Sequence, residues 1–185
     1  MVADTEGARR VDVFHWGLVP SWAKDRKIGQ RMINARSETL ADKPAFKRLF
    51  ATHRCVIPMD GFYEWKPGDR PRQPVFAHRA DGEPLAVAGL WAAWRDPERE
   101  SGEEWLHSAT VITTPANATM APIHDRMPAV LPRNEWNRWL DPGERDLEVL
   151  GRLLVPAPDD LLAVHDVSTE VNNVRNRGAH LVEPL

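Results

Sequence analysis

Five runs rich in β-branched, aromatic and small apolar residues follow one another through the middle of the chain. They cover residues 54–58, 62–66, 74–79, 85–94 and 105–114, with turn-forming or charged residues between them. Runs of this length and composition predict β-strands, and strands joined by short turns pair in antiparallel fashion. The pattern therefore restricts the fold to one built around a mostly antiparallel sheet.

Short helices are expected on either side of this strand region. Pro44 and Pro132 each stand where the first turn of a helix accepts proline, before apolar residues at helical spacing. We predict helices over residues 44–50, 134–140 and 144–151, further strands over 11–14 and 161–165, and a polar, loop-like tail over 171–176. This mixture predicts an α+β fold: a single domain over residues 1–185 with a mostly antiparallel or mixed, barrel-like sheet and short flanking helices.

Composition excludes several classes of protein. With 185 residues, 42% of them hydrophobic, the chain can fill one core. It has no apolar run long enough for a bilayer and no signal peptide at its start, so we expect a cytoplasmic protein without a membrane partner. The single Cys55 excludes a disulfide framework and a cysteine zinc site. The seven histidines show no metal-binding spacing, so neither a metal nor another cofactor is predicted.

The charges are unevenly distributed although the net charge is only −3. Residues 1–80 hold 15 Lys and Arg against 9 Asp and Glu, whereas residues 81–185 hold 9 against 18. A basic groove that follows a nucleic-acid backbone could be built from Lys24, Arg26, Lys27, Arg31, Arg36, Lys47, Arg48 and Arg54. A solvated charged face is the alternative.

Glu64 is the most unusual single position. It places a carboxylate inside the aromatic, strand-like segment 62–65, where apolar or β-branched residues are favoured. Strand alternation could simply turn Glu64 to solvent. However, segments 33–39 and 122–128 also concentrate polar groups between apolar runs. The three segments together favour one functional site.

Seven sequence segments occur in an order that resembles one known family. They are WGLVPSWAKD (16–25), INARSET (33–39), PAF (44–46), RCVIPMDGFYEW (54–65), LAVAGLW (85–91), TVITTPAN (110–117) and HDRMPAVL (124–131). From about residue 11 to its C-terminus, the chain resembles the SOS response-associated peptidase family. The resemblance implies a protein that recognises abasic sites in single-stranded DNA and crosslinks to them through an N-terminal cysteine, forming a thiazolidine. It also implies autocatalytic removal of the initiator methionine.

By the same resemblance, Asn34, Glu64 and His124 fall on the family's active-site positions. Glu64, if buried, and His124, of a residue type that titrates near neutral pH, suit the proton transfers of aldehyde chemistry, and Asn34 would orient a reacting group. The residues expected to contact DNA are Trp16, Trp22, Lys24, Arg36 and Ser37. The expected partner is single-stranded DNA with abasic sites, bound by a monomer.

Each of these assignments has a structural alternative. His124 could be a satisfied loop histidine, Asn34 a turn residue, and the two tryptophans core residues. Cys55, His124 and Asn34 could instead form a papain-like hydrolase, although the apolar neighbours of Cys55 favour a buried strand cysteine.

The N-terminus departs from the family pattern. Family members begin Met-Cys-Gly-Arg and continue for several dozen residues before the WGLVP segment, whereas here residue 2 is Val2 and that segment begins at Trp16. We therefore expect an N-terminally incomplete domain that lacks the crosslinking cysteine, which leaves its status as an enzyme open. Two hypotheses follow: an incomplete DNA-damage enzyme of this family, or a non-catalytic module that binds single-stranded DNA.

Overall fold

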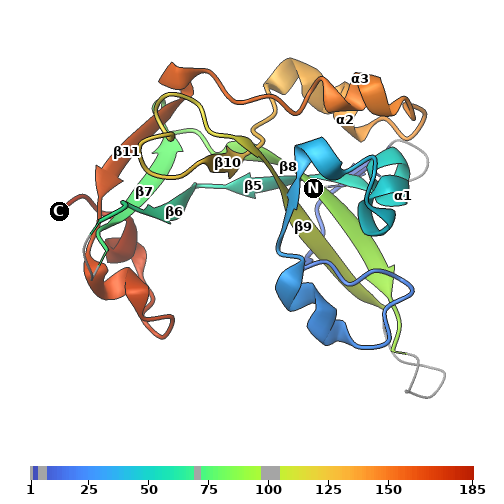
Figure 1. Cartoon of the computed structure of the whole chain (residues 1–185), viewed down its shortest axis with the longest axis horizontal. Coiled ribbons are helices and arrows are strands. Elements are labelled where there is room, and N and C mark those ends of the chain that lie inside the picture. Colours follow the sequence, from blue (N-terminus) through green and yellow to red (C-terminus); the bar gives the residue numbers. More distant parts are fainter. Residues whose placement is uncertain (1, 4–7, 69–71, 97–104) are drawn as a thin grey trace. The chain divides into compact units, whose positions relative to one another are not determined.

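The computed structural model describes residues 2–3, 8–68, 72–96 and 105–185, and Figure 1 shows their helices and strands. The chain divides into two compact units. The first unit comprises residues 1–57, 86–114 and 128–155, and the second comprises residues 58–85, 115–127 and 156–185. Both units combine strands with short helices, so the predicted α+β class is confirmed.

The larger sheet is centred on three strands of the first unit. They are β5 (Arg54–Met59), β8 (Leu85–Trp94) and β9 (Leu106–Pro115), and β8 pairs antiparallel with β9. Short strands extend the order to β10-β9-β8-β5-β1-β2, where β1 is Val2–Ala3, β2 is Arg9–Arg10 and β10 is Arg126–Pro128. Two more, β3 (His15–Trp16) and β4 (Asn34–Arg36), pair with β9 in parallel. The sheet is therefore mixed, with mostly antiparallel pairs.

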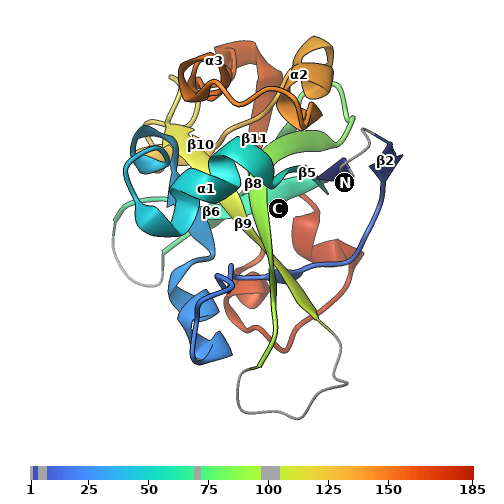
Figure 2. The same cartoon turned by 90° about the vertical axis from the view of Figure 1, so that its right-hand side faces the viewer.

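Three helices contribute side chains to the hydrophobic core of the first unit. They are α1 (Pro44–Thr52), α2 (Trp136–Leu140) and α3 (Leu147–Gly151), which can be followed in Figure 2. Their buried residues cluster with alternate residues of β8, because alternate strand positions face the same side. The cluster includes Phe46, Phe50, Ala88, Leu90, Ile112, Trp139 and Leu150. The α1 pattern of proline at the start and two buried phenylalanines matches its sequence prediction.

Arg54 is a structural residue of this core and not part of a basic groove. Its side chain is only 5% exposed, and its guanidinium donates hydrogen bonds to five backbone carbonyls. Those carbonyls belong to Phe50, Ala51, Trp139, Asp141 and Glu144, at or near the C-terminal ends of α1 and α2. Helix ends leave carbonyls without partners, so one buried arginine stabilises both. The predicted role of Arg54 in the groove is therefore wrong.

The second unit is built on a three-stranded antiparallel sheet with the order β11-β7-β6. Its strands are β6 (Gly61–Trp65), β7 (Pro74–Arg79) and β11 (Leu162–Asp166). The 3-10 helices η4 (Asp159–Leu161), η5 (Thr169–Asn172) and η6 (Ala179–Val182) flank β11 in the sequence. The Lys66 ammonium lies 2.5 Å from a carboxylate oxygen of Asp166, which links the segment after β6 to the end of β11.

Most predicted elements are present within a few residues, and the exceptions have local causes. The strand expected over residues 11–14 is absent, because Val11 and Val13 are 83% and 89% exposed, so the face that they share buries no apolar surface. The helix expected over residues 144–151 begins only at Leu147, where the Asp146 side chain caps the amides of the first turn. The tail forms η5 before it becomes irregular.

Candidate active site and nucleic-acid interface

Three of the predicted site residues form a row along β9. Because β3 and β4 follow one another beside this strand, Trp16 pairs with Ala109, Asn34 with Val111 and Arg36 with Thr113. Alternate residues of a strand face the same side of the sheet, so the side chains of Trp16, Asn34 and Arg36 share one face, about 7 Å from one to the next. All three are exposed. This row can contact an extended ligand.

Trp16 and Trp22 are surface residues. They are 61% and 62% exposed, so the interpretation of both as core residues is wrong. The Trp16 indole N–H donates to the Ile33 carbonyl at 2.9 Å, which holds its ring beside the start of β4. Exposed, held indole rings can stack on nucleic-acid bases.

A close contact between two glycines positions the loop that carries Trp22 and Lys24. Gly17 has a φ of +116°, and a Cβ atom there would lie 2.7 Å from the Gly29 carbonyl oxygen. Gly29 lies in the 3-10 helix η1 (Arg26–Arg31), near the end of the loop. The two backbones approach this closely because neither residue has a side chain. The start of the loop is thereby held against its end.

Glu64 lies on β6 opposite Val75 of β7, and its side chain is half-buried. The alternative that strand alternation turns it wholly to solvent is therefore wrong. Tyr63 and Trp65 face the other side of the sheet, where the Tyr63 ring lies 5.3 Å from the Phe76 ring. These neighbouring aromatic rings are thus not what buries the carboxylate.

The electrostatic surroundings of Glu64 join it to His124. Burial raises the pKa of the Glu64 carboxyl above its ordinary value; His124 acts to lower that pKa, and Asp125 acts to raise it. Glu64, His124 and Asp125 all belong to the second unit. A carboxyl group whose pKa is raised by burial, next to an imidazole, is an arrangement typical of proton-transfer sites.

His124 ends a compact turn. Its backbone N–H donates to the Met120 carbonyl at 3.0 Å, and its ring Nδ1 accepts the Arg126 backbone N–H at 2.9 Å. A carboxylate oxygen of Asp125 also lies 3.2 Å from Nδ1. The imidazole is 45% exposed, so one ring edge is held by the backbone while the ring stays accessible.

Two asparagines that the sequence did not single out support this arrangement. Asn117 is buried, and its side-chain amide donates to the Ala157 and Pro158 carbonyls while its oxygen accepts the Met120 N–H. It therefore anchors the turn that ends at His124. Asn172 accepts the Trp65 indole N–H at 2.7 Å and fastens η5 to β6, beside Glu64 in sequence. Asn117 lies in the quoted TVITTPAN segment, which was its only signal.

The predicted site residues are distributed over both units. The first unit holds Trp16, Trp22, Lys24, Asn34, Arg36 and Ser37, of which Ser37 opens the 3-10 helix η2 (Ser37–Thr39). The second unit holds Glu64 and His124, and the structure brings these two together. That Asn34 shares an active site with Glu64 and His124 remains a prediction.

Cys55 lacks the properties of a nucleophile. It is buried on β5, and burial raises the pKa of its thiol to about 12. At neutral pH the sulfur is therefore protonated and shielded from reactants. This supports the interpretation of Cys55 as a buried strand cysteine and removes the basis of the papain-like alternative.

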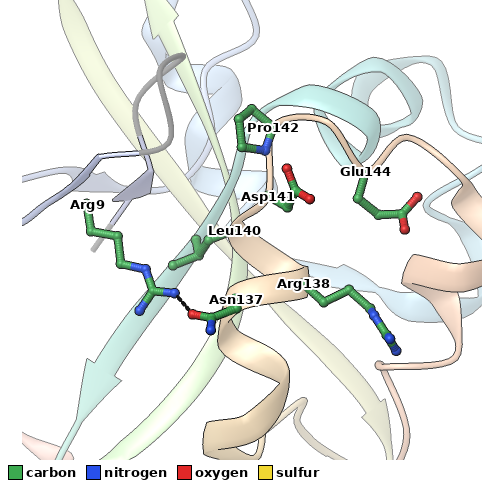
Figure 3. Close-up of a pocket in the computed structure, with 7 residues that line it drawn as sticks. All are labelled: Arg9, Asn137, Arg138, Leu140, Asp141, Pro142 and Glu144. Atoms are coloured by element: carbon green, nitrogen blue, oxygen red, sulfur yellow. Dashed lines mark hydrogen bonds between the residues drawn. The ribbon is translucent and has the colours of Figure 1, made fainter.

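A separate surface cavity of about 380 Å³ lies in the first unit and contains none of the predicted site residues. Its lining residues are Arg9, Asn137, Arg138, Leu140, Asp141, Pro142 and Glu144. Figure 3 shows the Arg9 guanidinium directed at the Asn137 side-chain oxygen, to which it donates a hydrogen bond. The lining carries two basic and two acidic side chains and no excess of either charge.

Within the described ranges, no group of three or more His, Cys, Asp or Glu side chains is arranged to hold a metal ion. In the same part of the chain, no helix has the length and apolar character needed to cross a membrane.

Known proteins resemble this chain in both sequence and structure. The family model of SOS response associated peptidases (SRAP) matches residues 1–174. The abasic site processing protein YoqW of Bacillus subtilis strain 168 is 41% identical over 175 residues, which cover 94% of this chain and 76% of YoqW. The abasic site processing protein HMCES of Xenopus tropicalis is 37% identical over 196 residues, covering 94% of this chain and 57% of HMCES.

A crystal structure of a Bacteroides thetaiotaomicron protein superposes with a TM-score of 0.87 at 26% identity. The superposition covers all of this chain and 79% of that protein. The sequence match spans nearly the whole chain, and the fold agrees with it. The chain therefore belongs to the SOS response associated peptidase family.

Proposed function

We propose that this protein binds single-stranded DNA at abasic sites and opens the sugar ring of the lesion by proton transfer through Glu64 and His124. The observation that carries the proposal is the half-buried Glu64, whose pKa burial raises, in electrostatic contact with His124. The choice of abasic DNA as the substrate follows the names of two relatives, which are abasic site processing proteins.

The reaction needs an acid and a base at one carbon atom. An abasic deoxyribose is a cyclic hemiacetal, and opening it breaks the C1′–O4′ bond, moves the O1′ proton to a base and gives O4′ a proton. The open-chain product carries a C1′ aldehyde and a free hydroxyl group at C4′. A carboxyl group and an imidazole that interact electrostatically, as Glu64 and His124 do, can supply both proton transfers. Asn34 would hold the O1′ or O4′ oxygen by a hydrogen bond.

The row along β9 would hold the DNA strand. Arg36 offers a charged fork to a phosphate, and Ser37 and Lys24 add polar contacts. The exposed indoles of Trp16 and Trp22 would stack on bases, which are accessible only in single strands.

The covalent step implied by the family requires a thiolate next to an amine, and Cys55 is the single cysteine of the sequence. Its thiol is buried with a pKa of about 12. Cys55 is therefore not proposed as the crosslinking nucleophile, and the proposal for the described residues concerns the opening of the sugar ring.

An alkoxyamine probe that captures the ring-opened aldehyde tests the proposal. The wild-type protein should accelerate capture on a single-stranded abasic oligonucleotide, and Glu64→Gln and His124→Gln should each lower that acceleration by about 100-fold or more. Cys55→Ala should keep it. Binding is measured separately by fluorescence anisotropy with a tetrahydrofuran abasic analogue, which cannot open. Tight binding by the wild type without faster capture would establish the non-catalytic DNA-binding module instead.

A further inference from the structure

Three polar groups surround one ring nitrogen of His124. The Arg126 backbone N–H donates to Nδ1 at 2.9 Å, whereas an Asp125 carboxylate oxygen and the Arg126 carbonyl oxygen each lie 3.2 Å from the same atom. The Arg126 N–H is a hydrogen-bond donor, whereas the Asp125 carboxylate and the Arg126 carbonyl oxygen are acceptors. The favoured partner of Nδ1 therefore depends on whether that nitrogen carries a hydrogen.

In the neutral ring, the shortest contact decides the tautomer. A nitrogen that accepts an N–H must present its lone pair, so the ring hydrogen then sits on the other nitrogen, Nε2. When the ring gains a second proton at Nδ1, the Arg126 amide loses its acceptor and the Asp125 carboxylate can receive the new N–H. A charged acceptor makes this the stronger of the two available bonds.

We propose that the turn 124–126 fixes neutral His124 with its hydrogen on Nε2, and that Asp125 is a positioning residue that receives a hydrogen bond from Nδ1 whenever that nitrogen is protonated. His124 thus presents a donor, and not a lone pair, on its outer edge. Glu64 on β6 interacts electrostatically with His124, and a carboxylate oxygen of the adjacent Asp125 lies 3.2 Å from its Nδ1.

The tautomer of His124 identifies which residue is the acid and which is the base in the proposed ring opening. This part of the inference rests on the proposed function. Protonated His124 gives its Nε2 hydrogen to O4′ as the C1′–O4′ bond breaks, and that bond's electron pair stays on O4′. Glu64 takes the O1′ hydrogen, and the O1′–H electron pair forms the C1′=O double bond. His124 is left neutral with its hydrogen on Nδ1, held by Asp125, until exchange with water restores the resting state.

The tautomer is tested directly, without any DNA. Long-range ¹H–¹⁵N correlation spectra of protein labelled with ¹⁵N-histidine distinguish a protonated ring nitrogen from an unprotonated one, and the signals lost in His124→Gln identify His124. At a pH where the ring is neutral, we expect the hydrogen on Nε2. A hydrogen on Nδ1 would overturn the proposal, whether or not the protein accelerates aldehyde capture.

The role of Asp125 is tested by Asp125→Asn, with Asp160→Asn as a control of equal charge change at another exposed aspartate of the second unit. We expect Asp125→Asn to weaken the hydrogen bond that Nδ1 donates in the protonated ring, which moves the Nδ1–H proton resonance of His124 upfield. It should also lower the maximal rate of aldehyde capture about tenfold with unchanged KM. Asp160→Asn should change neither quantity. An unchanged Nδ1–H resonance of His124 in Asp125→Asn would refute the positioning role even if the capture rate fell.

Discussion

At the scale of single residues, Glu64 is held where a charged carboxylate is unfavourable. Burial raises its pKa and the Asp125 charge acts in the same direction, opposed by His124. A strand residue selected for stability alone would be apolar, and carboxyl groups with perturbed pKa values concentrate at functional sites. The folded protein therefore loses stability at Glu64, which agrees with the proton-transfer role proposed for this residue.

Glu64→Gln should stabilise the protein at neutral pH and leave its stability unchanged in acid. Since the folded-state pKa of Glu64 lies above the unfolded one, the native state binds the proton more tightly, and the stabilisation by this proton is lost as pH rises through the folded-state pKa. The glutamine variant has no proton to lose. Its advantage should grow from about pH 4, near the unfolded-state pKa, and stay constant once the pH exceeds the raised folded-state pKa.

Urea unfolding of both proteins at a series of pH values measures this difference, with Glu83→Gln as a control at an exposed carboxylate. A constant difference between the wild type and Glu64→Gln over the whole pH range would contradict the prediction.

Glu64 could be singled out from the sequence because a carboxylate in an aromatic strand breaks a local rule. Asp125 could not be assigned its place, since its effect depends on which side chains the fold brings to it. Asn117 and Asn172 were missed for the same reason: their hydrogen-bond partners lie 40 and 107 residues away in the sequence. Residue type and spacing carry no information about such contacts.

At the scale of elements, the strands were predictable wherever composition and turn residues agree, as for β7 and β8, whose bounds match the prediction. The strand expected over residues 11–14 failed because alternation alone does not show that a face will be buried. The place of Arg54 was hidden in the same way, since the carbonyls it stabilises are contributed by two helices and the segment after α2.

Gly61→Ala should destabilise the protein because β6 and β7 pack closely at this position. An added Cβ atom would lie 2.4 Å from both the Ala77 carbonyl oxygen and the Phe76 ring. Relief would require β6, and Glu64 with it, to shift, at a cost of about 1–3 kcal/mol in the free energy of unfolding.

Gly151→Ala is the matched control, because nothing lies within 4 Å of the added atom at the end of α3. It should be neutral or stabilising by up to about 1 kcal/mol. Thermal or urea unfolding compares the two variants, and equal stability of both would show that β6 adapts without strain.

At the scale of the whole molecule, the sequence order of motifs did not reveal how they assemble. The parallel pairing of β3 and β4 with β9 joins residues that are 93 and 77 positions apart, as in Trp16 with Ala109 and Asn34 with Val111. Local patterns predict strands but not partners at such separations. The charge asymmetry could be seen in the sequence, and the pairing with β9 places Arg36 of the basic half on the same face as the exposed indole of Trp16, with Asn34 between them.

DNA binding should therefore favour single strands and depend on salt through Arg36. Each phosphate contact contributes about 0.7 to the slope of log affinity against log salt for a single strand, so Arg36→Ala should weaken binding to every sequence and reduce the slope by about that amount. Arg152→Ala removes an exposed arginine from the acidic half and should leave the slope unchanged.

Fluorescence anisotropy across a series of salt concentrations, with single-stranded and duplex oligonucleotides of one sequence, measures both effects. Equal affinity for duplex and single strand, or an unchanged slope in Arg36→Ala, would show that the row along β9 is not where the strand lies.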